Sequence, residues 1–171
     1  MKKIALISLL LLSTVAVVSA QRYAVIDSKY ILEHMPAYED AQAKLDQIAD
    51  QWQQDVDSKF EKVDKLYRDY DAEKVMLSES LKKKRQDEIM QLEKKAQKLQ
   101  KDYFGYHGKL FNKRKELIKP IQDKIYDAVQ KLAAKKMYDF VLDKASGVTV
   151  FYADPKLNKS DEILKILNLK K

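Results

Sequence analysis

The residues that come nearest to a chemical motif in this chain lie in the segment YFGYHGKLF, residues 103–111. Glycines followed by a lysine can form a phosphate-binding loop, in which backbone N–H groups and the ammonium group surround phosphate oxygens. That loop requires G-x-x-x-x-G-K-[ST], whereas Gly105 and Gly108 are three positions apart and Leu110 follows Lys109. The segment also lies inside a long helical pattern instead of following a strand. We therefore predict that it binds no nucleotide.

Side chains that could bind a metal or act as nucleophiles are also scarce. The 171 residues include no cysteine and only two histidines, His34 and His107, which lie far apart in the sequence. Zinc sites built from cysteine and histidine are therefore excluded. The 26 acidic residues are interspersed with 33 basic ones, and in helices such carboxylates are mostly solvated partners of lysines three or four positions away. We predict that the chain is not an enzyme and carries no cofactor or metal.

The third candidate is a run of four consecutive basic residues. Such a run can contact anionic lipid or lipopolysaccharide, with about 1 kcal/mol from each basic residue near the surface. It follows the expected start of a helix, where the helix dipole favours acidic residues instead. The alternative is a solvated helix start without a partner, and the sequence leaves both interpretations open. The run comprises Lys82, Lys83, Lys84 and Arg85.

Two long helices must carry these residues. Apolar side chains recur at steps of three and four over residues 41–70 and again over residues 89–132, which is the spacing of one buried stripe on a helix. We predict an antiparallel helical hairpin, an arm of residues 37–136 with its tip near residues 72–80. A helix of about 40 residues is about 60 Å long, so the arm must project from the rest of the molecule.

Two glycines interrupt the second helical stretch. Glycine in a helix interior costs about 1 kcal/mol relative to alanine, and kinks concentrate at glycine and proline. We interpret Gly105, Gly108 and the later Pro120 as a hinge, with a bend near residues 105–108 where the arm meets the body. A simple loop between two helices is the alternative, and it would also allow the arm to move.

The remaining segments predict a small β body. RYAVID, residues 22–27, is typical of a short strand, and residues 138–155 are typical of a hairpin. Three short strands are marginal alone, and association of several chains would cover their open edges. The predicted fold class is therefore α+β, with a long antiparallel coiled-coil hairpin inserted in a β body of residues 21–36 and 137–171 that oligomerisation completes. The strand residues expected at the contact between chains are Tyr23, Val25, Phe140, Leu142, Val148 and Val150.

The first twenty residues have the composition of an export signal. MKK is followed by an apolar stretch over residues 4–18 and by VSA, which are the basic, apolar and small-residue parts of a cleavable signal peptide. The apolar stretch is short for a membrane span of about 20 residues, so an uncleaved anchor is the less favoured alternative. We predict cleavage after residue 20, which removes Lys2 and Lys3 and lowers the formal net charge from +7 to +5. That charge favours anionic partners.

Several segments together resemble the Skp/OmpH family of periplasmic chaperones. The likeness covers essentially the whole chain after residue 20, and the block YFGYHGKLFNKRKELIKPIQDKI is similar to the Bacteroidetes branch of that family. It rests on element order and hydrophobic pattern more than on an invariant motif. The segments that carry it are RYAVIDSKYILEHMPAYEDAQAKLD, the charged hairpin, IKPIQDKIYDAVQKLAAKKMYDFVLD and GVTVFYADPKLNKSDEILKILNL.

The resemblance implies a homotrimer in which nine strands, three from each chain, form a small barrel and three helical hairpins enclose a cavity. Such proteins are holdases that bind unfolded outer-membrane β-barrel proteins in the periplasm without ATP. The best-studied members have a lipopolysaccharide site on the arms, whose residues do not align securely with this sequence. Many weak contacts inside such a cage would hold a mobile client. The tip residues expected to touch the client are Val75, Met76 and Leu77.

Two other functions stay open at the level of the sequence. A structural coiled-coil adaptor of the cell envelope would bind one folded partner and ignore denatured porins. A nucleic-acid binder is suggested by the basic composition alone. Export, the mixing of acidic with basic residues and the lack of a nucleic-acid-binding fold count against it, so we predict no nucleic-acid partner.

Overall fold

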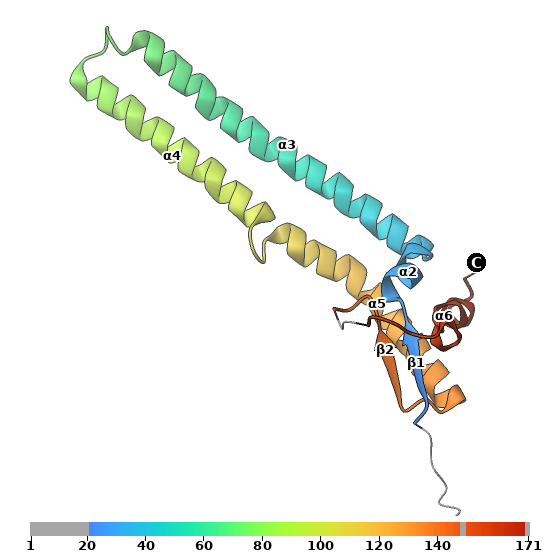
Figure 1. Ribbon diagram of the computed structural model, residues 1–171. Coiled ribbons are helices and arrows are strands. Elements are labelled where there is room, and N and C mark those ends of the chain that lie inside the picture. Colours follow the sequence, from blue (N-terminus) through green and yellow to red (C-terminus); the bar gives the residue numbers. More distant parts are fainter. Residues whose placement is uncertain (1–20, 148–149, 170–171) are drawn as a thin grey trace, which may run out of the picture.

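The computed structural model describes residues 21–147 and 150–169, and it shows a long arm that projects from a small body (Figure 1). The chain leads outward along one helix, reverses at residues 74–78 and returns along two helices that lie beside the first. The predicted signal peptide, residues 1–20, lies outside the described residues. The three helices of the arm are α3 (Pro36–Glu73), α4 (Glu79–Phe104) and α5 (Lys109–Lys136).

The apolar spacing in the sequence produces the seam of this hairpin. α3 is one unbroken helix of 38 residues, and Pro36 is its first residue, where a missing N–H leaves no hydrogen bond unmade. One stripe of α3 packs against α4 near the tip and against α5 near the body, so the predicted helical hairpin is confirmed. The members of the predicted stripe that are buried are Ala41, Leu45, Val56, Val63, Ile89, Ala96, Ile121, Ile125 and Leu132.

The body is built from segments that precede and follow the arm. β1 (Tyr23–Ile26) and β2 (Phe140–Asp143) pair in parallel, with Tyr23 opposite Phe140 and Ile26 opposite Asp143. The 113 residues between these strands include the whole arm. The pairing of β1 with β2 therefore joins the segments before and after the arm at its base. The other body elements are α2 (Ser28–Glu33), the 3-10 helix η1 (Pro155–Leu157) and α6 (Ser160–Ile166).

One hydrophobic core joins the body to the root of the arm. The inner face of α5 packs against α6 and α2, and Ile31 and Ile163 are fully buried there, each with 0% of its surface exposed. Full burial of one such side chain stabilises the fold by about 1.5–3 kcal/mol. The buried members of this core are Ile26, Ile31, Met35, Ala41, Ile121, Ile125, Ala128, Leu132, Ile163 and Leu164.

The predicted third strand does not form among the described residues. Val148 lies outside them, and Val150, Phe151 and Tyr152 belong to no strand. The hairpin predicted over residues 138–155 is therefore wrong for the described part of a single chain. In the described chain β2 pairs with β1 and not with residues 150–152, and β1 is also bridged at Val25 to Asn158.

β1 is also more deeply buried than a strand at a subunit contact should be. Val25 is 3% exposed, and its carbonyl accepts a hydrogen bond of 2.8 Å from the backbone N–H of Lys159. The Val25 side chain therefore packs within its own chain, contrary to the prediction. Tyr23 and Phe140 remain accessible: each is 43% exposed, and their rings stack with centroids 5.6 Å apart. Leu142 is half-buried.

Asp27 connects β1 to α2 and caps that helix. Its carboxylate accepts a hydrogen bond of 3.0 Å from the backbone N–H of Tyr30 and lies 3.0 Å from the Lys144 ammonium group. The Tyr30 hydrogen bond and then the Lys144 contact hold the pKa of Asp27 below its ordinary value. A lowered pKa means that this stabilisation is complete at neutral pH and is lost as the pH falls through the lowered pKa.

Ser160 links three segments of the body. It is 2% exposed, and its hydroxyl accepts a hydrogen bond of 2.9 Å from the backbone N–H of Asp27. The same hydroxyl donates to Asn158 Oδ1 at 2.7 Å. Since buried donors and acceptors without partners are costly, this hydroxyl fixes the end of β1 against the start of α6.

We expect Ser160→Ala to lower the free energy of unfolding by about 1–2 kcal/mol, because the Asp27 N–H loses its acceptor. Urea denaturation followed by circular dichroism measures the change. Ser146→Ala, which removes an exposed hydroxyl, is the matched control and should change the free energy of unfolding much less. Equal unfolding midpoints for both variants and the parent protein would contradict this role of Ser160.

Candidate functional site

The tip of the arm exposes two large apolar side chains. Val75 is 86% exposed and Met76 83% exposed, both in the turn between α3 and α4. Leu77, the third predicted contact residue, is half-buried. The turn has no third helix above it, so the exposed pair can contact a partner without displacing any of the arm's own packing.

The basic run lies just beyond this turn, but half of its charges are paired. Lys82 Nζ lies 2.7 Å from a carboxylate oxygen of Glu79, and Arg85 lies 3.3 Å from Glu88. α4 begins at Glu79, so an acidic residue occupies the first turn. The expectation that the run opposes the helix dipole is therefore wrong, because the run begins only at the fourth residue of the helix.

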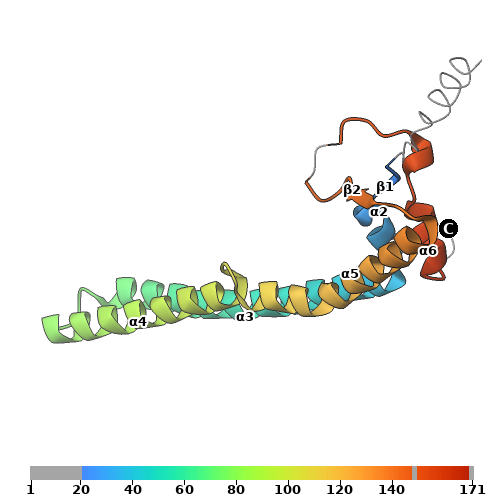
Figure 2. The same ribbon diagram turned by 90° about the horizontal axis from the view of Figure 1, so that it is seen from below.

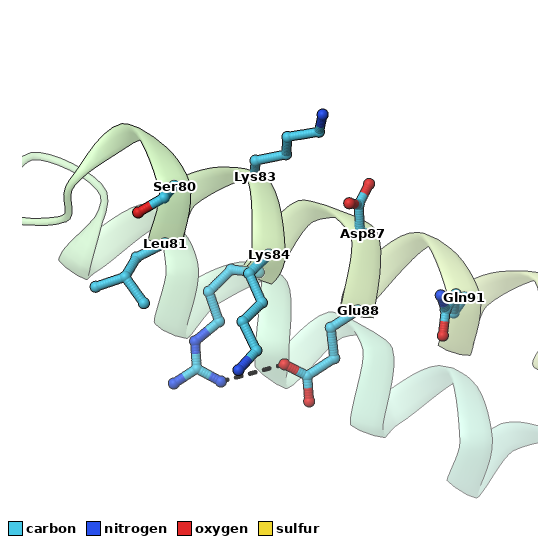
Figure 3. Close-up of a pocket in the computed structure, with 8 residues that line it drawn as sticks. Ser80, Leu81, Lys83, Lys84, Asp87, Glu88 and Gln91 are labelled. Atoms are coloured by element: carbon cyan, nitrogen blue, oxygen red, sulfur yellow. Dashed lines mark hydrogen bonds and ion pairs between the residues drawn. The ribbon is translucent and has the colours of Figure 1, made fainter.

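The four basic side chains also point in different directions. Successive residues are about 100° apart around a helix, and Figure 3 shows Lys83 and Asp87 on one side of α4 and Lys84 and Glu88 on the other. These residues border a hollow of about 750 Å³ that Leu81 and Gln91 also line. The structure therefore does not gather the run into one cationic patch.

The two glycines lie in a four-residue loop that separates α4 from α5. A Cβ atom at Gly105 would lie 2.4 Å from the Lys101 carbonyl oxygen, and one at Gly108 would lie 2.8 Å from the Tyr103 carbonyl oxygen. Glycine is required here by close backbone approach, since both residues have negative φ angles. Pro120 lies inside α5, which continues on both sides of it. The break at residues 105–108 is therefore a loop between two helices, and its role as a hinge stays a prediction.

An aromatic stack fastens this loop to α3. The rings of Trp52 and Tyr103 lie parallel with centroids 4.8 Å apart, and the Lys109 ammonium group lies 5.0 Å from the centre of the Tyr103 ring. Aromatic pairs contribute about 0.5–1.5 kcal/mol beyond the area that they bury. The helices on both sides of the break are therefore held at the same point of the seam.

The periodic pattern failed at Tyr106. Its spacing placed it on the buried stripe, but α4 ends at Phe104 and leaves Tyr106 94% exposed. The tyrosine ring packs against His107, with centroids 4.1 Å apart, and His107 packs edge-on against Phe111 at 4.9 Å. Sequence reasoning missed this exposed aromatic group, although a helix end between two glycines would have revealed it.

An apolar groove on the arm also escaped the sequence analysis. It has a volume of about 660 Å³ and lies between α3 and α4. Leu66, Leu92 and Leu99 form its apolar part, which a two-helix hairpin leaves open because there is no third helix to cover it. Its charged border consists of Lys59, Lys62, Lys65, Asp69 and Lys95.

Residues 21–147 and 150–169 contain no group of three or more histidine, cysteine, aspartate or glutamate side chains that could hold a metal ion. Over the same residues, none of the helices combines the length and the apolar character needed to cross a bilayer.

Comparison with known proteins identifies the family. A family model described as "Outer membrane protein (OmpH-like)" matches residues 22–167. The chain belongs to the OmpH-like family. This confirms the resemblance seen in the sequence, and OmpH-like proteins are chaperones, not enzymes.

Two individual proteins are similar to this chain, one in sequence and one in structure. An uncharacterized protein of Aquifex aeolicus (strain VF5) is 30% identical over 146 residues, which cover 85% of each chain. The crystal structure of a proposed outer membrane chaperone (OmpH-like) from Caulobacter crescentus CB15 superposes with a TM-score of 0.69. That match covers 88% of this chain and 85% of the other at 12% identity, so it supports the fold of arm and body.

Proposed function

We propose that the protein is an ATP-independent holdase that binds unfolded outer-membrane β-barrel proteins in the periplasm and prevents their aggregation. The observation that carries this proposal is an arm whose two-helix construction leaves apolar side chains and an apolar groove open to solvent. Membership of a chaperone family supports it. The predicted signal peptide, residues 1–20, supports export to that compartment.

Weak and distributed contacts suit such a role. The exposed Val75 and Met76 lie at the tip, and the groove around Leu92 lies farther down the same arm. A client that touches several such sites is retained by effective concentration, while each contact alone remains easy to break. Release then needs no nucleotide, in line with the absence of a phosphate-loop pattern in the sequence.

We further propose that three chains associate through the body. Each pairs β1 with β2 only, so among the described residues the outer edge of β2 has no strand beside it. Phe151 is 97% exposed and Tyr152 82% exposed close to this body in sequence. Unpaired edges and exposed aromatic side chains are typical of surfaces that another subunit covers. Three arms around one body would surround a client on several sides.

An aggregation assay tests the holdase and the contribution of the tip. A denatured outer-membrane β-barrel protein is diluted from urea without nucleotide, and light scattering is recorded with and without the purified protein, whose native mass should equal three chains. We expect suppression of scattering, and we expect Val75→Ser with Met76→Ser to require several-fold more protein for the same effect, because apolar contact area is lost.

The control is Met90→Ser, which changes one methionine on α4 that is 44% exposed. It should weaken suppression much less than the double variant, because it removes less exposed apolar area. If the parent protein does not reduce scattering, the proposed holdase function is wrong, and an envelope adaptor that binds one folded partner is favoured. A double variant as effective as Met90→Ser would instead remove Val75 and Met76 from the contact surface.

We also propose that the break at residues 105–108 lets the arm bend to admit clients of different size. It is the point where the returning helix is interrupted, and Pro120 within α5 removes one more helical hydrogen bond. In Gly105→Ala with Gly108→Ala, the new Cβ atoms would collide with backbone oxygens. We expect this variant to keep the subunit count and to hold a narrower range of client sizes.

Binding of a short and a long unfolded barrel protein, compared by native mass spectrometry, measures that range. Gly147→Asn is the control, because a Cβ there meets no atom within 4 Å and asparagine tolerates its φ of +81°. Unaltered retention of both clients by the alanine variant would show that the break is a fixed loop.

Finally, we propose that Lys82, Lys83, Lys84 and Arg85 contact anionic lipid or lipopolysaccharide at the end of the arm. Lys83 and Lys84 make no ion pair among the described residues, so we expect Lys83→Gln with Lys84→Gln to reduce binding to anionic vesicles by about tenfold. Flotation with anionic and with neutral vesicles measures this loss. Lys156→Gln with Lys165→Gln, two exposed body lysines that make no ion pair among the described residues, provides the control for net charge. Equal losses in both variants would contradict a specific contact at the tip.

A further inference from the structure

The positive charge of the protein is concentrated around the break in the arm. Residues 94–115 contain eight basic side chains and one acidic side chain, Asp102, so this segment alone has a formal charge of +7, equal to that of the whole 171-residue chain. The rest of the sequence is balanced. The basic residues are Lys94, Lys95, Lys98, Lys101, Lys109, Lys113, Arg114 and Lys115.

The fold leaves most of this charge unneutralised. Among the ion pairs of the described residues, the segment contributes one, between Lys113 and Glu116 at 2.9 Å. The neighbouring part of α3, residues 46–57, contains four aspartates and no basic residue, but no ion pair joins α3 to α4 or α5 in the described chain. A field of unpaired cations attracts anionic groups over about 8–10 Å at physiological salt.

An exposed aromatic group lies at the centre of this charged segment. We call Tyr106, His107 and Phe111 the aromatic cluster; Tyr106 is 94% exposed and Phe111 48% exposed. Figure 2 shows the loop between α4 and α5 standing out from the side of the arm toward which the body also extends. The arm's own packing therefore leaves Tyr106 almost fully exposed and Phe111 about half-exposed.

The structure holds the aromatic cluster in one position. His107 adopts a left-handed backbone conformation with φ of 59°, which is uncommon for residues other than glycine and costs free energy. Its carbonyl accepts a hydrogen bond of 3.3 Å from the Asn112 side chain. The stack of Trp52 on Tyr103 anchors the adjoining end of α4. These contacts fix the loop relative to the ends of α4 and α5.

We propose that the aromatic cluster and the cations of residues 94–115 form a binding site for unfolded polypeptide segments that combine aromatic with acidic residues. Aromatic side chains of the segment would pack on Tyr106 and Phe111, where ring pairs contribute about 0.5–1.5 kcal/mol beyond burial. Its carboxylates would lie among the lysines. This inference rests on the proposed holdase function. Because a holdase binds polypeptides, we expect the ligand to be a peptide and not a nucleic acid.

The proposal is tested with fluorescently labelled, unstructured peptides and the full protein. One peptide alternates aspartate with tyrosine and phenylalanine, a second has lysine in place of aspartate, and a third has alanine in place of the aromatic residues. Fluorescence anisotropy gives the Kd of each. We expect the first peptide to bind most tightly and to weaken as salt is raised, because the cations contribute through screened attraction.

Tyr106→Ser should raise the Kd of the first peptide by about two- to tenfold, the range that corresponds to one lost ring pair. Tyr126→Ser is the matched control, because Tyr126 is 63% exposed on α5 outside this segment, and it should leave the Kd unchanged. Both tyrosines are exposed, so circular dichroism should show the parent helix content in each variant.

Equal Kd values for the two variants would overturn the proposal, as would equal binding of the lysine peptide. A different result would show a general polyanion site instead: Tyr106→Ser weakens binding of a single-stranded oligonucleotide or of anionic vesicles but does not change the Kd of the acidic peptide. Failure here is distinct from failure of the proposed function. If the parent protein suppresses aggregation but Tyr106→Ser and Tyr126→Ser bind the peptide with the same Kd, only this inference is wrong. If the parent protein does not suppress aggregation, the proposed holdase function is wrong.

Discussion

The packing of one apolar stripe on α3 against the returning helices α4 and α5 is the constraint on which the rest of the structure depends. Two helices bury only the narrow strip where they meet, and the described arm accordingly buries a few side chains such as Leu45, Val56 and Ile89. Everything beyond that strip remains in contact with solvent. The arm can therefore be long, and it can offer grooves and charges along its length, but it gains little stability from its own core.

The body supplies what the arm lacks. Ten buried apolar residues converge at the root, nine from β1, α2, α3, α5 and α6 and one, Met35, from the connection between α2 and α3. The parallel pairing of β1 with β2 joins segments from opposite ends of the described chain. The arm is thus anchored at a single point, and its contacts with partners can vary along its length without loss of the fold. The interruption at residues 105–108 does not divide the arm, because the stack of Trp52 on Tyr103 holds α4 against α3 next to the break.

The regular parts of this fold followed from the sequence. Steps of three and four predicted the hairpin and most of its buried residues. These features depend on neighbours within one or two turns. The same reasoning failed at Tyr106, because periodicity cannot register that a helix has ended. It also failed at Val150, because β-type composition does not specify which strand a segment pairs with, and β2 pairs with the distant β1.

The amino-acid sequence by itself determined that the molecule has a long two-helix arm and that it has no cysteine for a disulfide or a cysteine-based zinc site. Composition and local spacing are sufficient for these conclusions. Only the tertiary structure decided that Val25 is enclosed by its own chain and that Tyr106 is exposed outside the seam. Such outcomes depend on where helices end and on which distant segments compete for the same surface, and no local pattern of residues contains that information.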